Sequence, residues 1–239
     1  MLNKARIQPN IAAICMSVCF ACWVLAQNTH ALLNEASLAQ VTQGFGEKGR
    51  QVFVDWTEFV IRQASDTQKG SEQAKLETIN RYFNERLKFV SDETHWQKED
   101  YWATPIESLA SAAGDCEDYV IAKYFSLIQS GIPQEKLRIT YVKAMKINQA
   151  HMVLAYYKAP KSEPLILDNL NPRILRASKR RDLVPVYSFN GMGLWLEQKR
   201  GQSIKVGTAS RLSMWMDVLF RMQAQGLEPW MQLPSGESN

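Results

Sequence analysis

Cysteine and histidine are both scarce in this chain of 239 residues, which holds four cysteines and three histidines. Three of the cysteines, Cys15, Cys19 and Cys22, lie in an apolar segment near the N-terminus, and only Cys116 lies beyond it. A single cysteine cannot form an internal disulfide. The Cys116 thiol is therefore either buried and inert or present for its reactivity.

The chain also lacks a strong net charge, internal repeats and low-complexity tracts. Its formal net charge is +4. Two of the basic residues, Lys4 and Arg6, lie in the N-terminal segment; without them the chain has 26 basic and 24 acidic residues, a net charge of +2. A charge this small gives no reason to expect nucleic acid or an anionic membrane as a partner.

Residues 1–31 have the pattern of a secretory signal peptide. A charged start precedes an apolar core from Ile11 to Ala26, which is slightly short for a membrane-spanning helix. Thr29-His30-Ala31 offers a small-x-Ala cleavage site, and Val24-Leu25-Ala26 offers a second. We therefore expect a signal peptide over 1–31 and one domain over 32–239. An uncleaved inner-membrane anchor is the alternative.

Two amphipathic helices are expected in the first part of that domain. Apolar residues recur at helical spacing over 47–64 and again over 71–89. A polar linker over 65–70 separates the two segments. Residues 91–113 are polar and aromatic, which predicts a loop-rich segment with a short helix near 106–112. The apolar faces of the two long helices are expected to form core.

The periodicity changes after the middle of the chain and indicates β-strands. Asn190-Gly191 is a pair typical of tight turns, and adjacent strands joined by short loops form antiparallel hairpins by default. The expected strands cover 137–145, 151–157, 165–168, 184–189 and 193–196.

Residues 209–225 are again amphipathic, and their methionine and aromatic side chains are expected to serve packing. A mobile tail is expected from Gly226. Helices followed by an antiparallel sheet predict a single α+β domain.

The stretch Gly114-Asp115-Cys116-Glu117-Asp118-Tyr119 places the lone cysteine at the start of a buried helix. Gly114 breaks the preceding segment, and Asp115 stands where a helix N-cap belongs. An apolar run follows and ends at Gly131. The positive end of the helix dipole favours thiolate, the form that attacks carbonyls, so Cys116 is the candidate nucleophile.

A nucleophilic cysteine needs a base and a third group that orients the base. His151 opens an expected strand, and folding that strand back on residues 165–168 brings Asp168 roughly opposite it. Asp168 can then accept a hydrogen bond from the far ring nitrogen. His95 lies in a polar stretch and is expected to be a solvated loop residue. These residue types alone leave an inert buried cysteine open as an alternative.

Five motifs together resemble the bacterial transglutaminase-like cysteine proteinase family. The similarity runs from about residue 50 to 196, and the signal segment and the residues beyond 200 carry none of it. The motifs are Gly114 to Tyr119, His151-Met152-Val153-Leu154, Leu167-Asp168-Asn169-Leu170, Tyr101-Trp102-Ala103-Thr104-Pro105 and Val186-Tyr187-Ser188-Phe189-Asn190.

The resemblance implies a transglutaminase-like, papain-like core in which a helical N-terminal part, with the catalytic cysteine at a helix start, packs on an antiparallel sheet. It implies a cysteine endopeptidase with Cys116 as nucleophile, His151 as base and Asp168 as the orienting group. The Cys116 backbone N–H and the Trp102 indole N–H are candidates for stabilising the oxyanion.

The resemblance also implies calcium beside the nucleophile, bound by Asp115 and Glu117. With Asp118, these residues place three carboxylates around one thiol, which should raise its pKa and oppose thiolate formation. A hard divalent cation with oxygen ligands would cancel that charge. The alternative is that Asp115 only caps the helix and Asp118 completes the cap.

The resemblance also implies a location and a substrate: a periplasmic enzyme that cleaves the N-terminal region of a large repeat adhesin at a di-alanine site. Cleavage would free the adhesin from the outer membrane and promote biofilm dispersal. It also implies inhibition by an inner-membrane receptor that senses cyclic di-GMP.

Two other classes stay open. One is an amidase or cross-linking acyltransferase with the same fold and triad, which a product assay separates from a protease. The other is a non-catalytic calcium-dependent binding module, in which Cys116→Ala would change nothing. The Cys–His–Asp set argues against a binding module, because such a module has no physical need for all three.

Overall fold

A computed structural model describes residues 32–65, 71–197 and 203–231 of the chain. The expected signal segment, residues 1–31, lies outside the described residues. Among the helices that are described, none is both long enough and apolar enough to cross a membrane.

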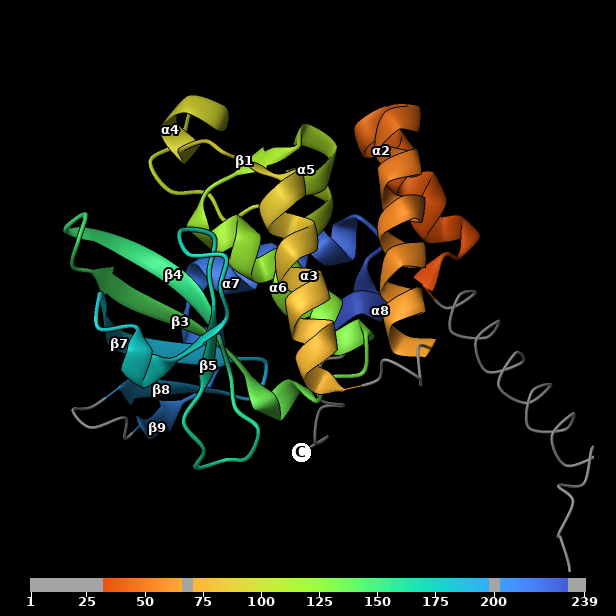
Figure 1. Cartoon of the computed structure of the whole chain (residues 1–239). Coiled ribbons are helices and arrows are strands. Elements are labelled where there is room, and N and C mark those ends of the chain that lie inside the picture. The colour runs from red at the N-terminus through yellow and green to blue at the C-terminus, as the bar shows by residue number, and fades with distance from the viewer. Residues whose placement is uncertain (1–31, 66–70, 198–202, 232–239) are drawn as a thin grey trace, which may run out of the picture.

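A seven-stranded antiparallel sheet forms one layer of the domain, and a group of helices packs beside it (Figure 1). The strand order is β6-β5-β4-β3-β7-β8-β9, so β3 and β4 lie near the middle. The strands are β3 (Leu137–Ala144), β4 (Gln149–Tyr156), β5 (Leu165–Leu167), β6 (Leu175–Arg176), β7 (Leu183–Asn190), β8 (Gly193–Glu197) and β9 (Ser203–Gly207). A separate parallel pair joins β1 (Lys88–Phe89) and β2 (Ala113–Gly114).

The helix that begins at the cysteine is central to the fold. This helix, α6 (Cys116–Gln129), packs against β3 and β4 on one side and against α2 (Glu35–Ser65), α3 (Glu72–Arg86) and α5 (Pro105–Ser111) on the other. Its apolar residues occupy nearly all sides, as expected for a helix with no solvent-facing stripe. The remaining α-helices of the described residues are α4 (Asp92–His95), α7 (Ser213–Ala224) and α8 (Glu228–Met231).

Strand β4 is buried on both faces. Met152 and Leu154 belong to the main core shared with the helices, whereas Val153 and Ala155 belong to a smaller cluster on the other side of the sheet. The alternation of side chains along a strand produces this division. The observed arrangement confirms the predicted α+β class, with helices packed on an antiparallel sheet.

Several element boundaries differ from the prediction. Helix α2 is broken by a kink at Gly46, whose φ of 67° is not helical, so the part after the kink begins at the expected Glu47, whereas the part before it, from Glu35, was not predicted. Strands β6 and β9 were not predicted. Both lie at the edges of the sheet, where β6 is only two residues long and β9 leaves Ile204 exposed, so neither has the buried alternation that marks an inner strand.

The prediction of a mobile tail from Gly226 is wrong for residues 226–231. Leu227 and Trp230 are fully buried, and the Trp230 ring stacks on Trp56 with 3.8 Å between ring centroids. Gln129 Nε2 donates to the main-chain oxygen of Pro229 at 2.9 Å. The C-terminal helices therefore complete the core.

Replacing Trp230 with alanine is expected to lower the free energy of unfolding by roughly 3–5 kcal/mol, because a fully buried indole leaves a cavity when it is removed. Urea unfolding of the two proteins measures the difference. Phe220→Ala is the matched control, because Phe220 on α7 is 70% exposed and its removal should change stability by no more than about 0.5 kcal/mol. Equal effects of the two substitutions would contradict a packed C-terminus.

Candidate active site

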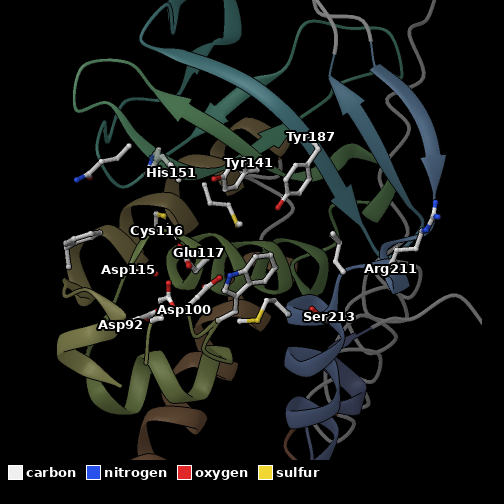
Figure 2. Close-up of a pocket in the computed structure, with 18 residues that line it drawn as sticks. Asp92, Asp100, Asp115, Cys116, Glu117, Tyr141, His151, Tyr187, Arg211 and Ser213 are labelled. Atoms are coloured by element: carbon white, nitrogen blue, oxygen red, sulfur yellow. Dashed lines mark hydrogen bonds between the residues drawn. The ribbon is translucent and has the colours of Figure 1, made fainter. Parts of the chain in front are cut away.

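A cleft of about 600 Å³ lies between the start of α6, the sheet and the segment that leads into α7 (Figure 2). Cys116 and Glu117 enter it from α6, and His151 enters from β4. Two of the three residues expected to form the triad therefore share one cleft, and the third lies directly behind the histidine.

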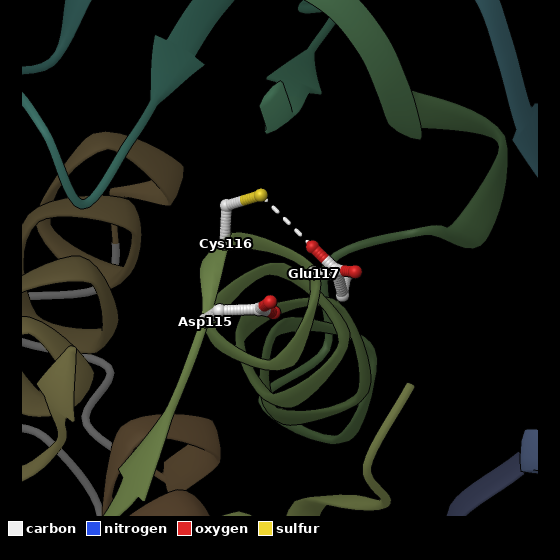
Figure 3. Close-up of side chains that lie close together, drawn as sticks. All are labelled: Asp115, Cys116 and Glu117. Atoms are coloured by element: carbon white, nitrogen blue, oxygen red, sulfur yellow. Dashed lines mark hydrogen bonds between the residues drawn. The ribbon is translucent and has the colours of Figure 1, made fainter. Parts of the chain in front are cut away.

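Cys116 is the first residue of α6 and is partly exposed in the cleft. Its thiol donates to Glu117 Oε2 at 2.8 Å (Figure 3). Burial raises the pKa of Cys116 well above its usual value, and the carboxylates of Glu117 and Asp115 raise it further. The surroundings of the thiol thus oppose thiolate, as predicted, through Glu117 and Asp115 among the three expected carboxylates.

His151 is buried, and its Nε2 atom lies 2.8 Å from Asp168 Oδ1. The other carboxylate oxygen of Asp168 accepts from Arg180 Nη2 at 2.7 Å, and Oδ1 also accepts from the Leu170 N–H at 3.0 Å. Burial alone would raise the pKa of Asp168, but the hydrogen bonds from His151 and Arg180 outweigh it and the pKa is lowered. Asp168 is therefore ionised at neutral pH, and Nδ1 is the ring nitrogen of His151 that is not engaged with it.

The register of the sheet differs from the expected one. The β4–β5 ladder pairs Leu154 with Leu167, so Asp168 follows the end of β5 instead of facing His151 directly. Its side chain still reaches the ring. His95 lies on the short helix α4, partly buried with its ring 4.3 Å from the Trp96 ring, and is not a solvated loop residue.

Asp118 holds the loop before α6 in place. Its Oδ2 atom accepts from the Asp115 N–H at 3.2 Å, and its Oδ1 atom accepts from the Ala103 N–H at 2.7 Å. Both oxygens are therefore used by main-chain donors, as the capping interpretation of Asp118 predicts. A Cβ atom on Gly114 would lie 2.6 Å from Asp118 Oδ2, which explains the glycine at this position.

Gly114→Ala is expected to destabilise the protein by about 1–3 kcal/mol, because the new methyl group must displace the buried Asp118 carboxylate, which accepts two hydrogen bonds. Chemical denaturation measures the change. Gly44→Ala is the comparison, since a Cβ atom there meets nothing within 4 Å and alanine is favoured over glycine inside a helix by up to about 1 kcal/mol. A loss of stability in both variants would argue against the close approach at Gly114.

Acidic side chains from two segments gather beside the thiol. The cluster contains Asp92, Asp100, Asp115 and Glu117. Among the described residues, three overlapping groups of three residues each bring their ligand atoms within 4.8 Å of one another, and two of these groups also include Cys116 or Asp118. Asp92 and Asp100 come from the segment before α5, and sequence reasoning missed them. That segment had been recognised only as a loop leading to the cysteine helix, and its acidic residues were the available signal.

The geometry of this cluster fits a hard divalent cation. Asp92 Oδ1 and Asp115 Oδ1 are buried and have no hydrogen-bond partner among the described residues. Burial and the charge of Glu117 raise the pKa of Asp115 to about 9, and burial raises the pKa of Glu117 to about 7. The raised pKa values show that burying these carboxylates side by side in ionised form costs free energy, and two of their oxygen atoms have no partner within the described part of the chain. Such carboxylates are suitable ligands for a cation such as Ca²⁺.

The wall of the cleft across from the acidic cluster is largely aromatic and apolar. Tyr141 and Tyr187 stack with 5.1 Å between ring centroids. Trp102 also lines the cleft, and its main-chain oxygen accepts a hydrogen bond from Arg221 of α7. Arg211, just before α7, lines the cleft as well, so the C-terminal segment contributes both to its wall and to its support.

A lone cysteine at a buried helix start, in a cleft it shares with a histidine and on a helix-plus-antiparallel-sheet core, defines a cysteine protease of the transglutaminase-like fold. The comparisons with known proteins agree with this class. The model of the bacterial transglutaminase-like cysteine proteinase family matches residues 56–192, and the chain belongs to that family.

Solved structures of Legionella pneumophila LapG are similar to this chain. One has 38% sequence identity and a TM-score of 0.67, and the match covers 80% of this chain and 98% of LapG. An EGTA-treated LapG structure matches with 39% identity, a TM-score of 0.67 and the same coverage. A calcium-bound LapG structure matches with 39% identity and a TM-score of 0.64, over 77% of this chain and 97% of that one. The comparison with curated proteins returned no match.

Proposed function

We propose that this chain is a calcium-dependent periplasmic cysteine endopeptidase with Cys116 as nucleophile, His151 as base and Asp168 as the orienting group. The observation that carries this proposal is the 2.8 Å contact between His151 Nε2 and Asp168 Oδ1, behind a cleft that His151 shares with Cys116. The contact fixes the tautomer in which Nε2 carries the proton and Nδ1 is free to accept one.

The chemistry follows from these positions. His151 Nδ1 takes the proton of the Cys116 thiol, and the sulfur attacks the scissile carbonyl carbon. The Cys116 backbone N–H, at the start of α6, is a donor for the oxyanion. His151 then protonates the leaving amine, and a thioester remains. Water, deprotonated by His151, attacks the thioester carbonyl carbon. The C–S bond breaks, the acyl part leaves as a carboxylic acid, and the sulfur takes the proton back from His151.

Calcium fits the acidic cluster by the chemistry of its donors. Asp115 and Glu117 would hold the ion, with Asp92 and Asp100 close enough to complete the set. Calcium would supply positive charge that offsets the carboxylates around the thiol and thereby lowers the pKa of Cys116. The similarity to a LapG structure that is described as calcium-bound supports the same assignment.

The proposed substrate is the N-terminal region of a large, LapA-like repeat adhesin, cut at a di-alanine bond. Release of the adhesin would promote biofilm dispersal. The proposed inhibitor is a LapD-like inner-membrane receptor for cyclic di-GMP. These assignments rest on the family resemblance, on the similarity to LapG and on the expected signal peptide.

The test is cleavage of the N-terminal fragment of the large repeat adhesin from the same cell by purified residues 32–239. Cys116→Ala and a calcium chelator are the two controls. A cut at a di-alanine bond that both controls abolish is the expected result. A cut that survives the chelator would retain the protease and discard the metal.

The same experiment separates the other two classes. Supplying an amine acceptor and analysing the products by mass distinguishes hydrolysis from acyl transfer. If no cut occurs and Cys116 also resists alkylation in the presence of calcium, the protein is better described as a binding module.

A further inference from the structure

The amino group of a lysine is fully buried on the helix that carries the nucleophile. Lys123 lies on α6 with no exposed surface, and it follows Cys116 by seven residues, or about two turns, so both side chains leave the helix on nearly the same face. Burial lowers the pKa of Lys123 to about 7. The fold keeps this amino group where an apolar side chain would pack without such a penalty, and the catalytic steps above do not use it.

Lys123 is connected to the aspartate behind the histidine through one amide group. Its Nζ atom donates to Asn84 Oδ1 at 2.7 Å, and Asn84 Nδ2 donates to the main-chain oxygen of Asp168 at 2.9 Å. Asn84 belongs to α3, so the link joins three elements. The amide oxygen bonds to the helix of the nucleophile, and the amide nitrogen bonds to the residue that contacts His151.

We propose that Asn84 and Lys123 are positioning residues that set the place of Asp168, and through it the His151 ring, relative to the helix that carries Cys116. The inference rests on the proposed role of Asp168. That residue lies just past the last ladder pair of β5, so the link acts where the sheet register no longer fixes the chain. A displacement of Asp168 would pass to His151 through their 2.8 Å contact, and a misplacement of about 1 Å in a catalytic group can cost roughly 100-fold in rate.

The variant that isolates this link is Asn84→Asp. Its carboxylate still accepts from Lys123, but it cannot donate to the Asp168 carbonyl. We expect kcat to fall roughly 10- to 100-fold with KM nearly unchanged, while the melting temperature falls by only a few degrees, to about the same extent as in the control variant described next.

The chain offers a matched control in Asn80→Asp. Asn80 lies one turn earlier on α3, is buried where Asn84 is partly buried, and its Nδ2 atom donates to the main-chain oxygen of Pro172 at 3.0 Å. This variant removes the same kind of hydrogen bond, from an asparagine amide to a main-chain oxygen of the same loop, four residues beyond Asp168. We expect its kcat to stay close to that of the wild type. An equal loss of kcat in both variants would overturn the inference, because the bond at Asn84 would then only stabilise the loop.

A double-variant comparison shows whether the effect passes through Asp168. In an Asp168→Asn background, measured by single turnover at high enzyme concentration, Asn84→Asp is expected to cause no further loss. A general loosening of the fold would lower the rate again by the same factor. If Asp168→Asn itself retains full activity, the proposed function fails. If it is inactive while Asn84→Asp matches Asn80→Asp, only the positioning inference fails.

A second variant covers the case in which Asn84→Asp does not fold. Lys123→Met combined with Asn84→Leu removes the buried amine and its acceptor together, so neither is left unpaired, and the Asp168 carbonyl loses its donor as it does in Asn84→Asp. The same loss of kcat is expected in this double variant. Wild-type kcat in it would overturn the proposal.

Discussion

His151→Gln is expected to lower kcat/KM for peptide cleavage by about 10⁴-fold, because it removes the proposed base that takes the thiol proton and returns it to the leaving amine. Glutamine can still donate a hydrogen bond to Asp168, so we expect the free energy of unfolding to change by no more than about 2 kcal/mol. Cleavage assays and urea unfolding of the same preparation measure both quantities.

The chain provides a natural control in His95→Gln. His95 lies on α4, and it is not one of the residues that line the cleft. This variant is expected to retain the activity of the wild type. A large loss in His95→Gln, or full activity in His151→Gln, would require a different base.

Removal of calcium is expected to lower the rate of cleavage by at least about 100-fold, with recovery when calcium is restored. Without the ion, burial and the carboxylates of Glu117 and Asp115 hold the pKa of Cys116 well above its usual value, so little thiolate exists at pH 7. Each unit by which a cation lowers that pKa increases the thiolate fraction about tenfold, and two units give the expected factor. Alkylation of Cys116 by iodoacetamide, with calcium and with chelator, measures the thiolate without a substrate.

Glu117→Gln separates the two effects of that side chain. It removes a proposed calcium ligand, so more calcium should be needed for activity. In chelator it also removes a negative charge beside the thiol, and Cys116 should therefore be alkylated faster than in the wild type. Glu99→Gln is the matched control, since Glu99 lines the cleft but belongs to none of the close acidic groups. Alkylation rates that respond neither to chelation nor to Glu117→Gln would contradict the charge argument.

The sequence predicted the centre of this fold better than its edges. The cysteine helix and strand β4 have long apolar patterns with clear ends, and both were predicted with nearly correct bounds. Strand β9 has exposed apolar residues, so its pattern differs from that of a buried strand. The core role of Trp230 depends on Trp56, which lies far away in the sequence, and no local pattern contains that contact.

The site shows the same division between local and distant contacts. Asp115 and Glu117 flank Cys116, so their electrostatic effect could be predicted from their position. Asp92 joins the same cluster only because the segment before α5 folds over the start of α6. The link from Lys123 through Asn84 to Asp168 joins two helices and a strand end, and a single sequence carries no signal for it.

The contact of Arg221 with the Trp102 carbonyl bears on how the enzyme is made. A ribosome delivers the chain from its N-terminus, so Trp102 and Cys116 are synthesised long before α7. Arg221 supports the cleft wall and Trp230 closes the core, and both are synthesised only after the whole region that matches the family, residues 56–192. The nascent chain therefore contains every residue of the proposed triad while it still lacks a finished cleft. We therefore expect that a protein truncated after residue 192 would carry the whole matched family region without being a working protease.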